Sequence, residues 1–409
     1  MRIAFLSSFY HKHCLQIYAK YKNLDKKSYL EQGKIIENET ICSMGQWPYY
    51  FKNEGWETIM LCRNNPFIQS KWCEENDFIP SSDDHEFEIV LEQVKRFKPN
   101  IIFTFGASYY FHNNKLNTLL KKTPSVEKKF SWHGAPEGND QLIFKQYDLV
   151  FTNSKELRDS LISKGINSKQ LNHAFEAKAL NLITKRKKNN RLCFFGSIMR
   201  GNEWHNERKN YLKEISNRYT IDIYSDIYSS TVKERLKRFY IEKRYSSCIL
   251  LANLGVKNKF VRHYSNRDIL PTFNDLKEEE LFSKSKEPVY GIDMLQKLSE
   301  YVLSFNLHIK HTGSYACNMR LFESGGVGTA MLTDKKNNLN SIFNEERDIL
   351  TFNSINEALH LIDKNIYNSE LLEEMAIRAQ KCILKNHTTP NQFDKLFSLI
   401  NEYINKKIN

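Results

Sequence analysis

The sequence predicts an α/β protein with two Rossmann-like domains that face a cleft. Three observations lead to this fold class. Short apolar segments alternate with segments of helical periodicity in both halves of the chain, a polar and basic stretch separates the two series, and 409 residues exceed what one hydrophobic core normally serves. Ligands of open parallel sheets bind beyond the carboxyl ends of the strands, so we expect a site between the two halves.

The first series contains five predicted strands. The segment Ile101–Phe105 is almost continuously apolar, as in a strand that is buried on both faces. Before it, residues 86–97 repeat apolar side chains at helical spacing, and a proline follows. Ser154 is placed to cap a helix that runs through Lys164 and ends at Gly165. The five strands are expected at Arg2–Ser7, Glu57–Cys62, Ile101–Phe105, Lys129–Trp132 and Leu149–Thr152.

Residues 184–190 are polar, basic and without periodicity, which predicts a linker between a domain at 1–183 and a second domain at 191–390. The second domain repeats the alternation. Within it, residues 227–288 are charged and only partly helical, so we interpret them as an insertion. A helical pattern over 391–409 closes the chain. The second-domain strands are expected at Arg191–Phe195, Ile221–Ser225, Tyr301–Asn306, Thr329–Thr333 and Ile349–Phe352, with a helix over Asn206–Arg218.

The composition is basic, with 60 Lys and Arg against 48 Asp and Glu, a net charge of +12 and a pI near 9.1. This balance indicates an anionic partner, such as nucleic acid, a membrane surface or a phosphorylated substrate. Alternatively, the chain is simply rich in lysine, and its charge says nothing about a partner. No apolar stretch reaches the roughly 20 residues of a bilayer span, and no cleavage site follows the first strand, so we expect a cytoplasmic chain. The eight cysteines are scattered, which predicts reduced, mostly buried thiols and no metal site.

The most informative stretch runs from residue 318 to residue 334. Arg320 and Glu323 lie on a short predicted helix that is entered from the loop 312–315. A glycine-containing loop that opens into a helix offers free N–H groups and a positive dipole end to a phosphate, and a glutamate further along can accept both hydroxyls of a ribose. Alternatively, Glu323 is a surface helix residue and the glycines at 325–328 only make a turn.

This stretch resembles the C-terminal signature of the CgeB-like glycosyltransferases, which belong to the two-domain GT-B class; the matching residues are Arg320, Phe322, Glu323, Thr329, Leu332, Thr333 and Asp334. Three further segments fall where that family places them: Phe194–Ser197 followed by Arg208, Asp148–Lys155, and Lys385–Thr388. The agreement covers roughly residues 130–225 and 290–409. The resemblance implies that the first domain is the acceptor side, that the second binds a nucleotide sugar, and that the closing helix packs back on the first domain.

The resemblance implies roles only at matching positions. Glu323 would bind the ribose of the nucleotide-sugar donor, and Arg208 and Arg320 would neutralise the departing diphosphate without a metal, although Arg208 could equally belong to a solvated helix face. No cofactor is implied, because the nucleotide sugar is a co-substrate. Retaining relatives carry a second glutamate eight residues before the first; Tyr315 stands there in this chain, which leaves retention and inversion both open. The positions expected along the diphosphate are Gly196, Ser197, Gly313, Ser314 and Tyr315.

His133 and Glu137 follow a predicted strand on the side where the cleft should lie. Related enzymes often hold a catalytic histidine after a comparable strand, so we predict His133 as a catalytic residue and Glu137 as an acid or base. The alternative is a histidine kept for packing or capping. His11 and His13 follow the first strand, and we expect them in a solvated loop. His308 precedes the predicted phosphate loop and could reach the donor.

Three functions compete at this stage. The leading one is sugar transfer from a nucleotide sugar to a glycan or lipid-linked acceptor, by resemblance a bacterial surface polysaccharide or glycoconjugate, at the inner face of the membrane. The second is a nucleotide-sugar epimerase of the same fold. The third is a protein that binds nucleic acid or an anionic membrane through the dense basic run Lys233–Arg244, which could also be only a solvated face. Because the basic residues are spread throughout the chain, no nucleic acid is expected.

Overall fold

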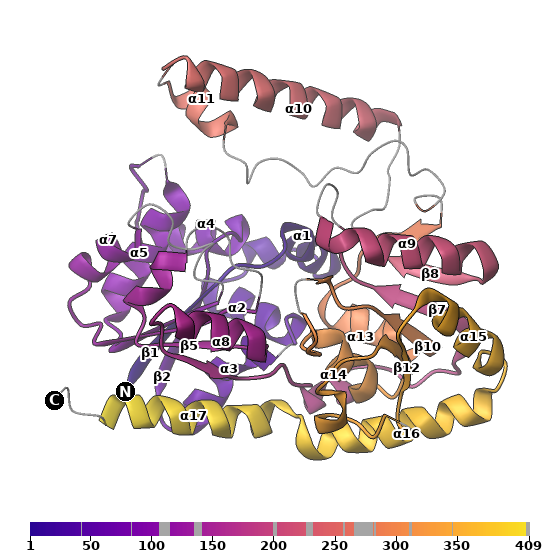
Figure 1. Cartoon of the computed structure of the whole chain (residues 1–409). Helices are drawn as coiled ribbons and strands as arrows, with labels where there is room; N and C mark the ends of the chain where they lie inside the picture. Colours follow the sequence, from indigo (N-terminus) through magenta and orange to yellow (C-terminus); the bar gives the residue numbers. More distant parts are fainter. Residues whose placement is uncertain are drawn as a thin grey trace.

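The computed structural model describes residues 1–41, 43–82, 84–105, 115–134, 141–198, 203–225, 232–256, 258–265, 281, 284–310, 313–345 and 347–405. The chain forms two α/β halves that lie side by side, and a helical hairpin stands apart from both of them (Figure 1). In each half, helices cover a parallel six-stranded sheet. The predicted fold class is confirmed.

The first sheet has the strand order β2-β1-β3-β4-β5-β6, and all neighbouring strands are parallel. Successive residues of β1 (Arg2–Ser7) enter different cores: Ile3 and Phe5 pack on one face, and Ala4 and Leu6 on the other. This alternation buries both faces of the strand, as its continuous apolar sequence requires. The strands are β1 (Arg2–Ser7), β2 (Glu57–Cys62), β3 (Ile101–Phe105), β4 (Lys128–Trp132), β5 (Leu149–Thr152) and β6 (Ser168–Gln170).

The helices of the first half include three that the sequence analysis did not predict, between β1 and β2. One of them, α1, begins at His11, so the expectation of a solvated loop at His11 and His13 is wrong. Its buried face carries His13, Cys14 and Ile17 at helical spacing. The helices are α1 (His11–Lys20), α2 (Tyr29–Glu39), α3 (Ser43–Asn53), α4 (Pro66–Glu75), α5 (His85–Phe97), α7 (Lys115–Lys122) and α8 (Lys155–Ser163).

Helix α8 illustrates how the local sequence fixes an element. The Ser154 side chain accepts a hydrogen bond from the backbone N–H of Leu157, which satisfies a free donor of the first turn. Gly165 follows the helix with a φ of +75°, a conformation that glycine adopts without strain. Both ends lie where the sequence places them.

The second sheet has the strand order β12-β11-β10-β7-β8-β9 and is also parallel. Two expectations need correction. The first strand begins at Asn189, inside the predicted linker, because Asn189 pairs with Tyr301. The end of the predicted insertion, Ser285–Lys286, belongs to the sheet as its edge strand. The strands are β7 (Asn189–Phe195), β8 (Ile221–Tyr224), β9 (Ser285–Lys286), β10 (Tyr301–Asn306), β11 (Ala330–Asp334) and β12 (Leu350–Phe352).

The helices of the second half lie on both faces of its sheet, except for α10 and α11, which form the separate hairpin (Figure 1). No helix among the described residues is long and apolar enough to cross a bilayer. The helices are α9 (Glu203–Arg218), α10 (Val232–Asn253), α11 (Lys259–Tyr264), α13 (Gly291–Ser299), α14 (Met319–Gly326), α15 (Ile355–Asn365) and α16 (Ser369–Asn386).

The last helix, α17 (Thr389–Asn405), crosses from the second half to the first and lies along it (Figure 1). Its side chains Phe393, Leu396 and Ile400 belong to the core that also contains Phe5 and Phe51. The closing helix therefore packs back on the first half, as predicted. Helix α17 continues directly from α16 of the second half, and its apolar side chains are buried in the core of the first half. This burial stabilises the contact between the two halves.

Phe175 holds the segment between α16 and α17, where the chain crosses from the second half to the first. Its backbone N–H donates to the carbonyl of His387, and its carbonyl accepts from the N–H of Thr389. The buried ring lies against Gly326 at the end of α14, where an added Cβ would come within 2.3 Å of the ring. Only a residue without a side chain fits there.

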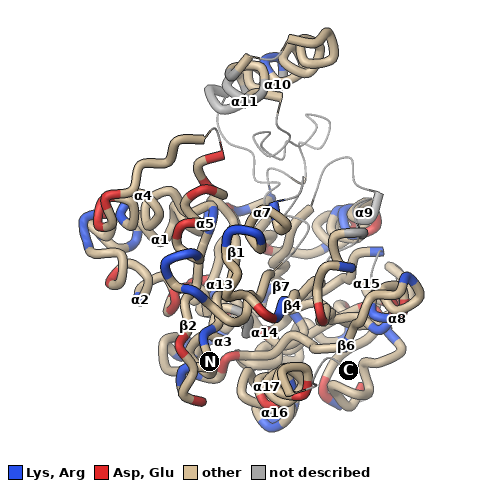
Figure 2. Tube along the Cα trace, turned by 90° about the vertical axis from the view of Figure 1, so that its left-hand side faces the viewer, with Lys and Arg blue, Asp and Glu red and all other residues tan. Residues whose placement is uncertain are grey.

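Lys and Arg are spread over both halves, with Asp and Glu among them (Figure 2). Of the described cysteines, five are buried and two are intermediate in exposure. Both distributions agree with the sequence analysis.

Candidate active site

The strand order places a topological switch point between β7 and β10. From β7 the chain continues to β8 on one side, whereas β10 continues to β11 on the other. Connections that leave in opposite directions open a crevice at the carboxyl ends of the two strands, and ligands of open α/β sheets bind there. The candidate site is therefore built around Phe195–Ser197 after β7 and Asn306–His308 after β10.

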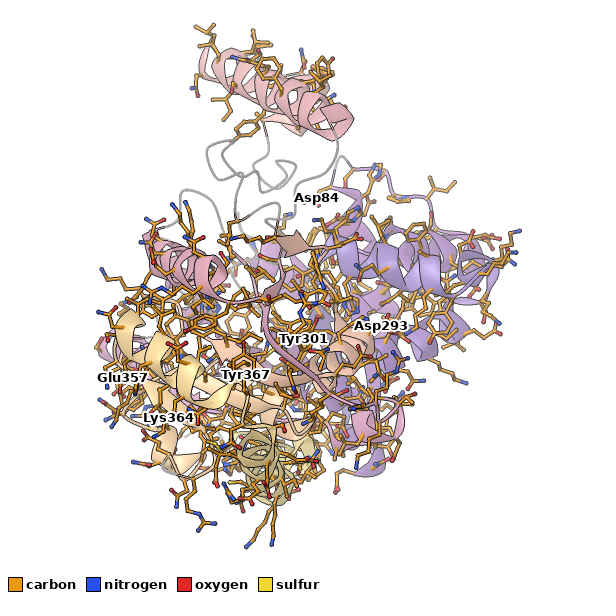
Figure 3. The ribbon with its side chains drawn as sticks, turned by 90° about the vertical axis from the view of Figure 1, so that its right-hand side faces the viewer. Asp84, Asp293, Tyr301, Glu357, Lys364 and Tyr367 are labelled. Carbon is orange, nitrogen blue, oxygen red and sulfur yellow. The ribbon has the colours of Figure 1, made fainter. Side chains whose placement is uncertain are left out.

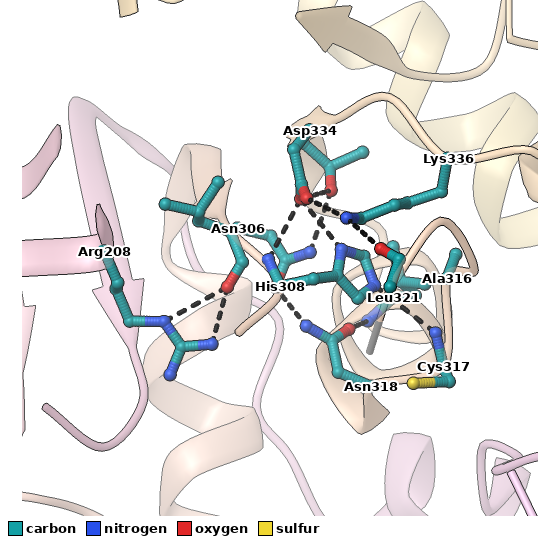
Figure 4. Close-up of polar contacts among 12 residues, drawn as sticks. Arg208, Asn306, His308, Ala316, Cys317, Asn318, Leu321, Asp334 and Lys336 are labelled. Atoms are coloured by element: carbon teal, nitrogen blue, oxygen red, sulfur yellow. Dashed lines mark hydrogen bonds and ion pairs between the residues drawn. The ribbon is translucent and has the colours of Figure 1, made fainter. Parts of the chain in front are cut away.

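Arg208, on α9, spans this switch point. Its Nε and Nη2 donate to the carbonyl of Leu307 at 3.1 and 2.5 Å (Figure 4). Its Nη1 donates to the carbonyl of Ser197 at 2.9 Å. Burial lowers the pKa of Arg208 to about 10, the negative charge of Asp334 opposes this shift, and the charge of Arg320 adds to it. The group stays protonated at neutral pH. The carbonyls hold the guanidinium in place without cancelling its charge, so Arg208 is not part of a solvated helix face.

The N-terminus of α14 is fastened to the end of β10. Asn318 caps the helix by accepting from the N–H of Leu321, and its Nδ2 donates to Oδ1 of Asn306 at 2.7 Å (Figure 4). Asn306 in turn donates to Oγ1 of Thr333 at 2.8 Å, on the neighbouring strand. This chain of amides aims the first N–H groups of α14 at the crevice, where they favour an anion.

A second set of polar contacts holds the loop that enters α14. Asp334 accepts from the Nδ1 of His308 at 2.8 Å and lies 3.2 Å from the ammonium of Lys336. Burial would raise the pKa of Asp334, but the hydrogen bond and charge of His308, with the charge of Lys336, bring it down to about 2. The other ring nitrogen of His308 accepts from the N–H of Cys317 at 3.4 Å. His308 is thus a buried support for the loop (Figure 4).

Glu323 is buried at 8% exposure, so the alternative of a surface helix residue is wrong. Its Oε2 lies 2.8 Å from Nη1 of Arg320, one helical turn earlier, but has no hydrogen-bond partner of good geometry among the described residues. Arg320 also donates from Nε to the carbonyl of Phe195 at 3.2 Å, and its guanidinium lies over the Phe195 ring. The pair therefore joins α14 to the end of β7.

The predicted phosphate loop Gly313–Tyr315 contacts the first half of the molecule. Ser314 donates to Glu156 at 3.1 Å, and the ammonium of Lys155 lies 5.5 Å from the centre of the Tyr315 ring. On the other side, the ammonium of Lys336 donates to the carbonyl of Gly313 at 2.8 Å. The loop is thus held between the start of α8 and the end of β11.

Another contact between the halves lies beside β5 of the first sheet. The side-chain amide of Asn153 donates to the carbonyl of Cys317 at 2.9 Å and lies 3.3 Å from the Nε2 of His173. Burial lowers the pKa of His173 to about 3, and its ring packs on Trp132 at 4.9 Å between centres. Asn153 therefore joins the first sheet directly to the residue before the Asn318 cap.

Helix α1 makes a third contact between the halves. The ring of His13 stacks on Tyr290, with 5.3 Å between centres, and Lys20 bridges Glu39 and Asp293 at 3.0 and 2.9 Å. Asp293 lies where the second half meets the first (Figure 3). Burial lowers the pKa of His13 to about 4, with Asp293 opposing the shift and Lys20 adding to it.

The predicted catalytic histidine follows β4 at the carboxyl edge of the first sheet. The backbone N–H of His133 donates to the carbonyl of Phe151 at 2.8 Å, and its ring lies 4.7 Å from that of Phe144. The side chain is buried, so the residue packs beneath the edge of the sheet. Glu137 lies outside the described residues. The catalytic roles of both residues stay predictions.

The structure brings the second-half candidates together. Gly196, Ser197, Arg208, Arg320 and Glu323 are joined through the carbonyls of Phe195 and Ser197, while Gly313–Tyr315 are joined to them through Lys336, Asp334 and His308. Sequence reasoning missed three supports of the site, Asn306, Asn318 and Asn153. The signal for Asn318 was its position three residues before Leu321, typical of a helix cap. No group of three or more His, Cys, Asp or Glu that could hold a metal occurs among the described residues.

Comparisons with known proteins bear on the family and on the fold. Residues 266–398 match a family described as glycosyl transferase-like. The solved structures that the chain resembles in fold include sucrose-phosphate synthase from Thermosynechococcus elongatus (8% identity, 100% of both chains covered, TM-score 0.55), Anabaena HepE in complex with UDP-glucose (11%, 98% of this chain and 100% of the other, 0.53), and a glycosyltransferase from Rickettsia africae (9%, 99% of both, 0.53). No curated protein matches the sequence.

The shared architecture assigns the chain to the GT-B fold class. The residues that match the glycosyl transferase-like family, about a third of the chain, contain α14 and its Arg320–Glu323 pair, and together with the shared architecture this match supports a glycosyltransferase.

Proposed function

We propose that the protein transfers a sugar from a nucleotide-sugar donor to a glycan or lipid-linked acceptor, as a CgeB-like enzyme that needs no metal. The observation that carries this proposal is the position of Arg208 across the switch point between β7 and β10, beside the N-terminus of α14. A fixed cation and a helix N-terminus at one crevice fit a diphosphate. They also fit the charge that develops when a nucleoside diphosphate departs.

The leaving group is the centre of the proposed mechanism. As the bond between the sugar and the diphosphate breaks, negative charge grows on the departing phosphate oxygens. Arg208 would neutralise that charge from a position already fixed by two carbonyls, so it would not need to reorganise during the reaction. The amides of α14 would contribute from the other side, because the contact between Asn318 and Asn306 holds the helix N-terminus in place.

Glu323 would bind the ribose. Its Oε2 is buried, and its only neighbour of opposite charge in the described part of the chain is Arg320, so the carboxylate has capacity to accept from sugar hydroxyls. Arg320 would keep the carboxylate oriented. The identity of the base is open; because HepE was crystallised with UDP-glucose, UDP-glucose is the first donor to test.

The acceptor side is proposed to be the carboxyl edge of the first sheet, where His133 and Glu137 would handle the proton of the acceptor hydroxyl. The acceptor class that we propose is a bacterial surface polysaccharide or glycoconjugate. Both stereochemical outcomes stay open, because Tyr315 occupies the position of the second glutamate of retaining relatives. Contacts of the first half with the loop Gly313–Tyr315 support a transfer in which both halves close on the two substrates.

The test compares two arginine variants. Arg208→Met should weaken binding of UDP, measured by calorimetry, at least about tenfold, since a charged hydrogen-bonding partner of the diphosphate is lost. Arg378→Met is the matched control, because Arg378 likewise donates from Nε and Nη2 to one backbone carbonyl, that of Arg347, at 3.1 and 3.0 Å. It should bind UDP like the wild type.

If UDP does not bind the wild type, the same comparison is made with GDP, dTDP, CMP and ADP. Equal losses in the two variants, or no binding of any nucleotide by the wild type, would contradict the proposal. Formation of an isomerised donor without any acceptor would reassign the chain to epimerase chemistry on the same fold.

A further inference from the structure

The hairpin of α10 and α11 is a separate structural unit. It stands away from both sheets (Figure 1), and side chains project from α10 on all sides (Figure 3). The two helices contact each other, Cys248 on α10 and Val261 on α11 are buried, and the guanidinium of Arg244 lies 3.7 Å from the centre of the Tyr264 ring. One side of α10 therefore lies against α11, and the hairpin stands clear of both sheet domains in the part of the chain that the structure describes (Figure 1).

A neighbouring face of α10 is apolar. Five large side chains on α10 and directly after it are between 60% and 72% exposed, and Leu251 is 40% exposed. Successive members are three, one, ten and four positions apart, which at 100° per residue places all of them within one stripe along the helix. The five are Leu236, Phe239, Tyr240, Leu250 and Leu254. We call these five residues and Leu251 the α10 stripe.

The same helix is strongly cationic. Its sequence has six Lys or Arg and two Glu, and α11 adds a Lys and an Arg. Lys243 lies within the α10 stripe, and its ammonium sits 5.5 Å from the centre of the Phe239 ring. A lysine in this position can bury its carbon chain with the apolar neighbours while its charge reaches outward. Exposed apolar and basic groups thus occupy one surface.

We propose that the α10–α11 hairpin docks on an anionic lipid surface, with the α10 stripe inserted at the headgroup level. A helix with an exposed apolar stripe and a basic polar face lies in the membrane interface, and anionic headgroups attract its charges. A second copy of the chain is a poorer occupant, because pairing two stripes would bring two cationic helices together. Nucleic acid is also poorer, because it would leave the leucines of the stripe in water.

This inference goes beyond sugar transfer and does not depend on it. The hairpin shares no described hydrogen bond or ion pair with the residues around Arg208 and Glu323, so docking and donor binding can be measured independently. Docking would bring the enzyme to acceptors that are carried on lipid.

The test is flotation of the full chain with vesicles. We expect the wild type to float with vesicles of phosphatidylglycerol and phosphatidylcholine and not with phosphatidylcholine alone, and to be released as salt rises from about 0.05 M to about 0.5 M. Replacing Leu236, Phe239 and Leu250 together by Ser should weaken this binding at least about a hundredfold. The matched control replaces Leu30, Ile79 and Tyr367 by Ser, since these are at least as exposed and lie elsewhere; its binding should not change.

Two charge-reversal variants complete the experiment. Lys243→Glu should weaken vesicle binding at least about tenfold, whereas Lys121→Glu, on an exposed position of α7, should not. Unchanged thermal midpoints and unchanged UDP binding of all four variants would show that the effects lie in docking. Four results would overturn the proposal: no vesicle binding by the wild type, equal binding to uncharged vesicles, self-association that the triple stripe variant abolishes, or capture of an oligonucleotide in preference to anionic vesicles.

Discussion

The carboxyl edges of the two sheets are built differently. At the second edge, polar groups hold one another in fixed positions: Arg208 on two carbonyls, Asn318 on Asn306, and Asp334 on His308. At the first edge, rings and imidazoles are packed, with Trp132 on His173 and His133 on Phe144. The second edge is arranged in advance for an anion, whereas the first is rigid through packing and through its contacts with the second half.

This difference has a physical consequence for substitutions. When a buried polar group loses its hydrogen-bond partner, the free energy of unfolding falls by the desolvation penalty of that group. The loss of a single hydrogen bond at the second edge should therefore lower stability. The stability of the first edge should instead depend on the volume of its packed side chains and on the protonation of its buried histidines. The four predictions below separate the two edges, beginning with the place where the halves meet.

The largest effect is expected at Gly326, where the two halves share Phe175. Gly326→Ala places a Cβ 2.3 Å from the Phe175 ring, inside contact distance, and should lower the free energy of unfolding by at least about 3 kcal/mol. Urea unfolding measures this change. Gly33→Ala is the control, because its Cβ would meet no atom closer than 4.0 Å in the middle of α2; it should raise stability by about 0.5–1 kcal/mol. Equal changes in the free energy of unfolding of the two variants would mean that the contact of Phe175 with Gly326 does not hold the two halves together.

The next effect concerns acid and the contact between the halves at α1. The folded pKa of His13, about 4, lies below the unfolded value of 6.5, so the unfolded chain takes up the proton first and stability falls as pH drops from 6.5 to 4. His13→Phe keeps the stack on Tyr290 and removes the titration. Relative to wild type, the variant should gain about 3 kcal/mol between pH 7 and pH 4. Parallel stability curves for the two proteins would contradict the burial of His13.

Asp334 tests the second edge, and its titration has the same sign as that of His13, because a folded pKa below the unfolded value again makes the fold less stable as pH falls. Its folded pKa, about 2, lies below the unfolded value of 3.8, so its carboxylate stabilises the fold above pH 3.8 and loses that contribution as pH falls to 2. Asp334→Asn should therefore cost about 2 kcal/mol at pH 7, with a difference from wild type that shrinks below pH 4. Chemical unfolding at several pH values measures it. A cost that does not change with pH would assign the effect to shape and not to charge.

The smallest of the four effects is expected at Asn153. Asn153→Ala removes the donor to the carbonyl of Cys317 and should lower stability by about 1 kcal/mol. It should also weaken UDP binding by less than Arg208→Met does, because it acts only through the loop before α14. Saturation binding of UDP to both variants gives the comparison. A larger loss in Asn153→Ala would make the contact between the halves, and not the second edge alone, the main determinant of donor binding.

The fold was largely predictable because its signals are local. Strands such as Ile101–Phe105 and Tyr301–Asn306 lie at their predicted bounds, since an apolar run between turn residues needs no distant information. Helix α1 was missed because its buried face depends on Tyr290, far away in the chain. Strand β9 was missed because its two residues, Ser285 and Lys286, have no apolar pattern and exist only through pairing with β8.

The candidate site was predictable to the extent that its residues are contiguous. Arg320 and Glu323 were found because they share one short helix, and the structure joins them as an ion pair. The support from His308 to Asp334 could not be found, because it links the ends of two different strands. The burial of His133 also follows from packing that no local pattern encodes.

The central claim is that Glu323 and its surroundings form a nucleotide site. The most direct measurement is thermal unfolding of wild type, Glu323→Gln and the control Glu74→Gln, which removes an exposed ion pair of the same helical spacing with Lys71 at 3.0 Å, each with and without nucleoside diphosphates. One nucleotide, at about 100 times its dissociation constant, should stabilise wild type and Glu74→Gln by about 2.7 kcal/mol and should stabilise Glu323→Gln far less. Stabilisation of all three proteins alike, or of none of them by any nucleotide, would contradict the claim.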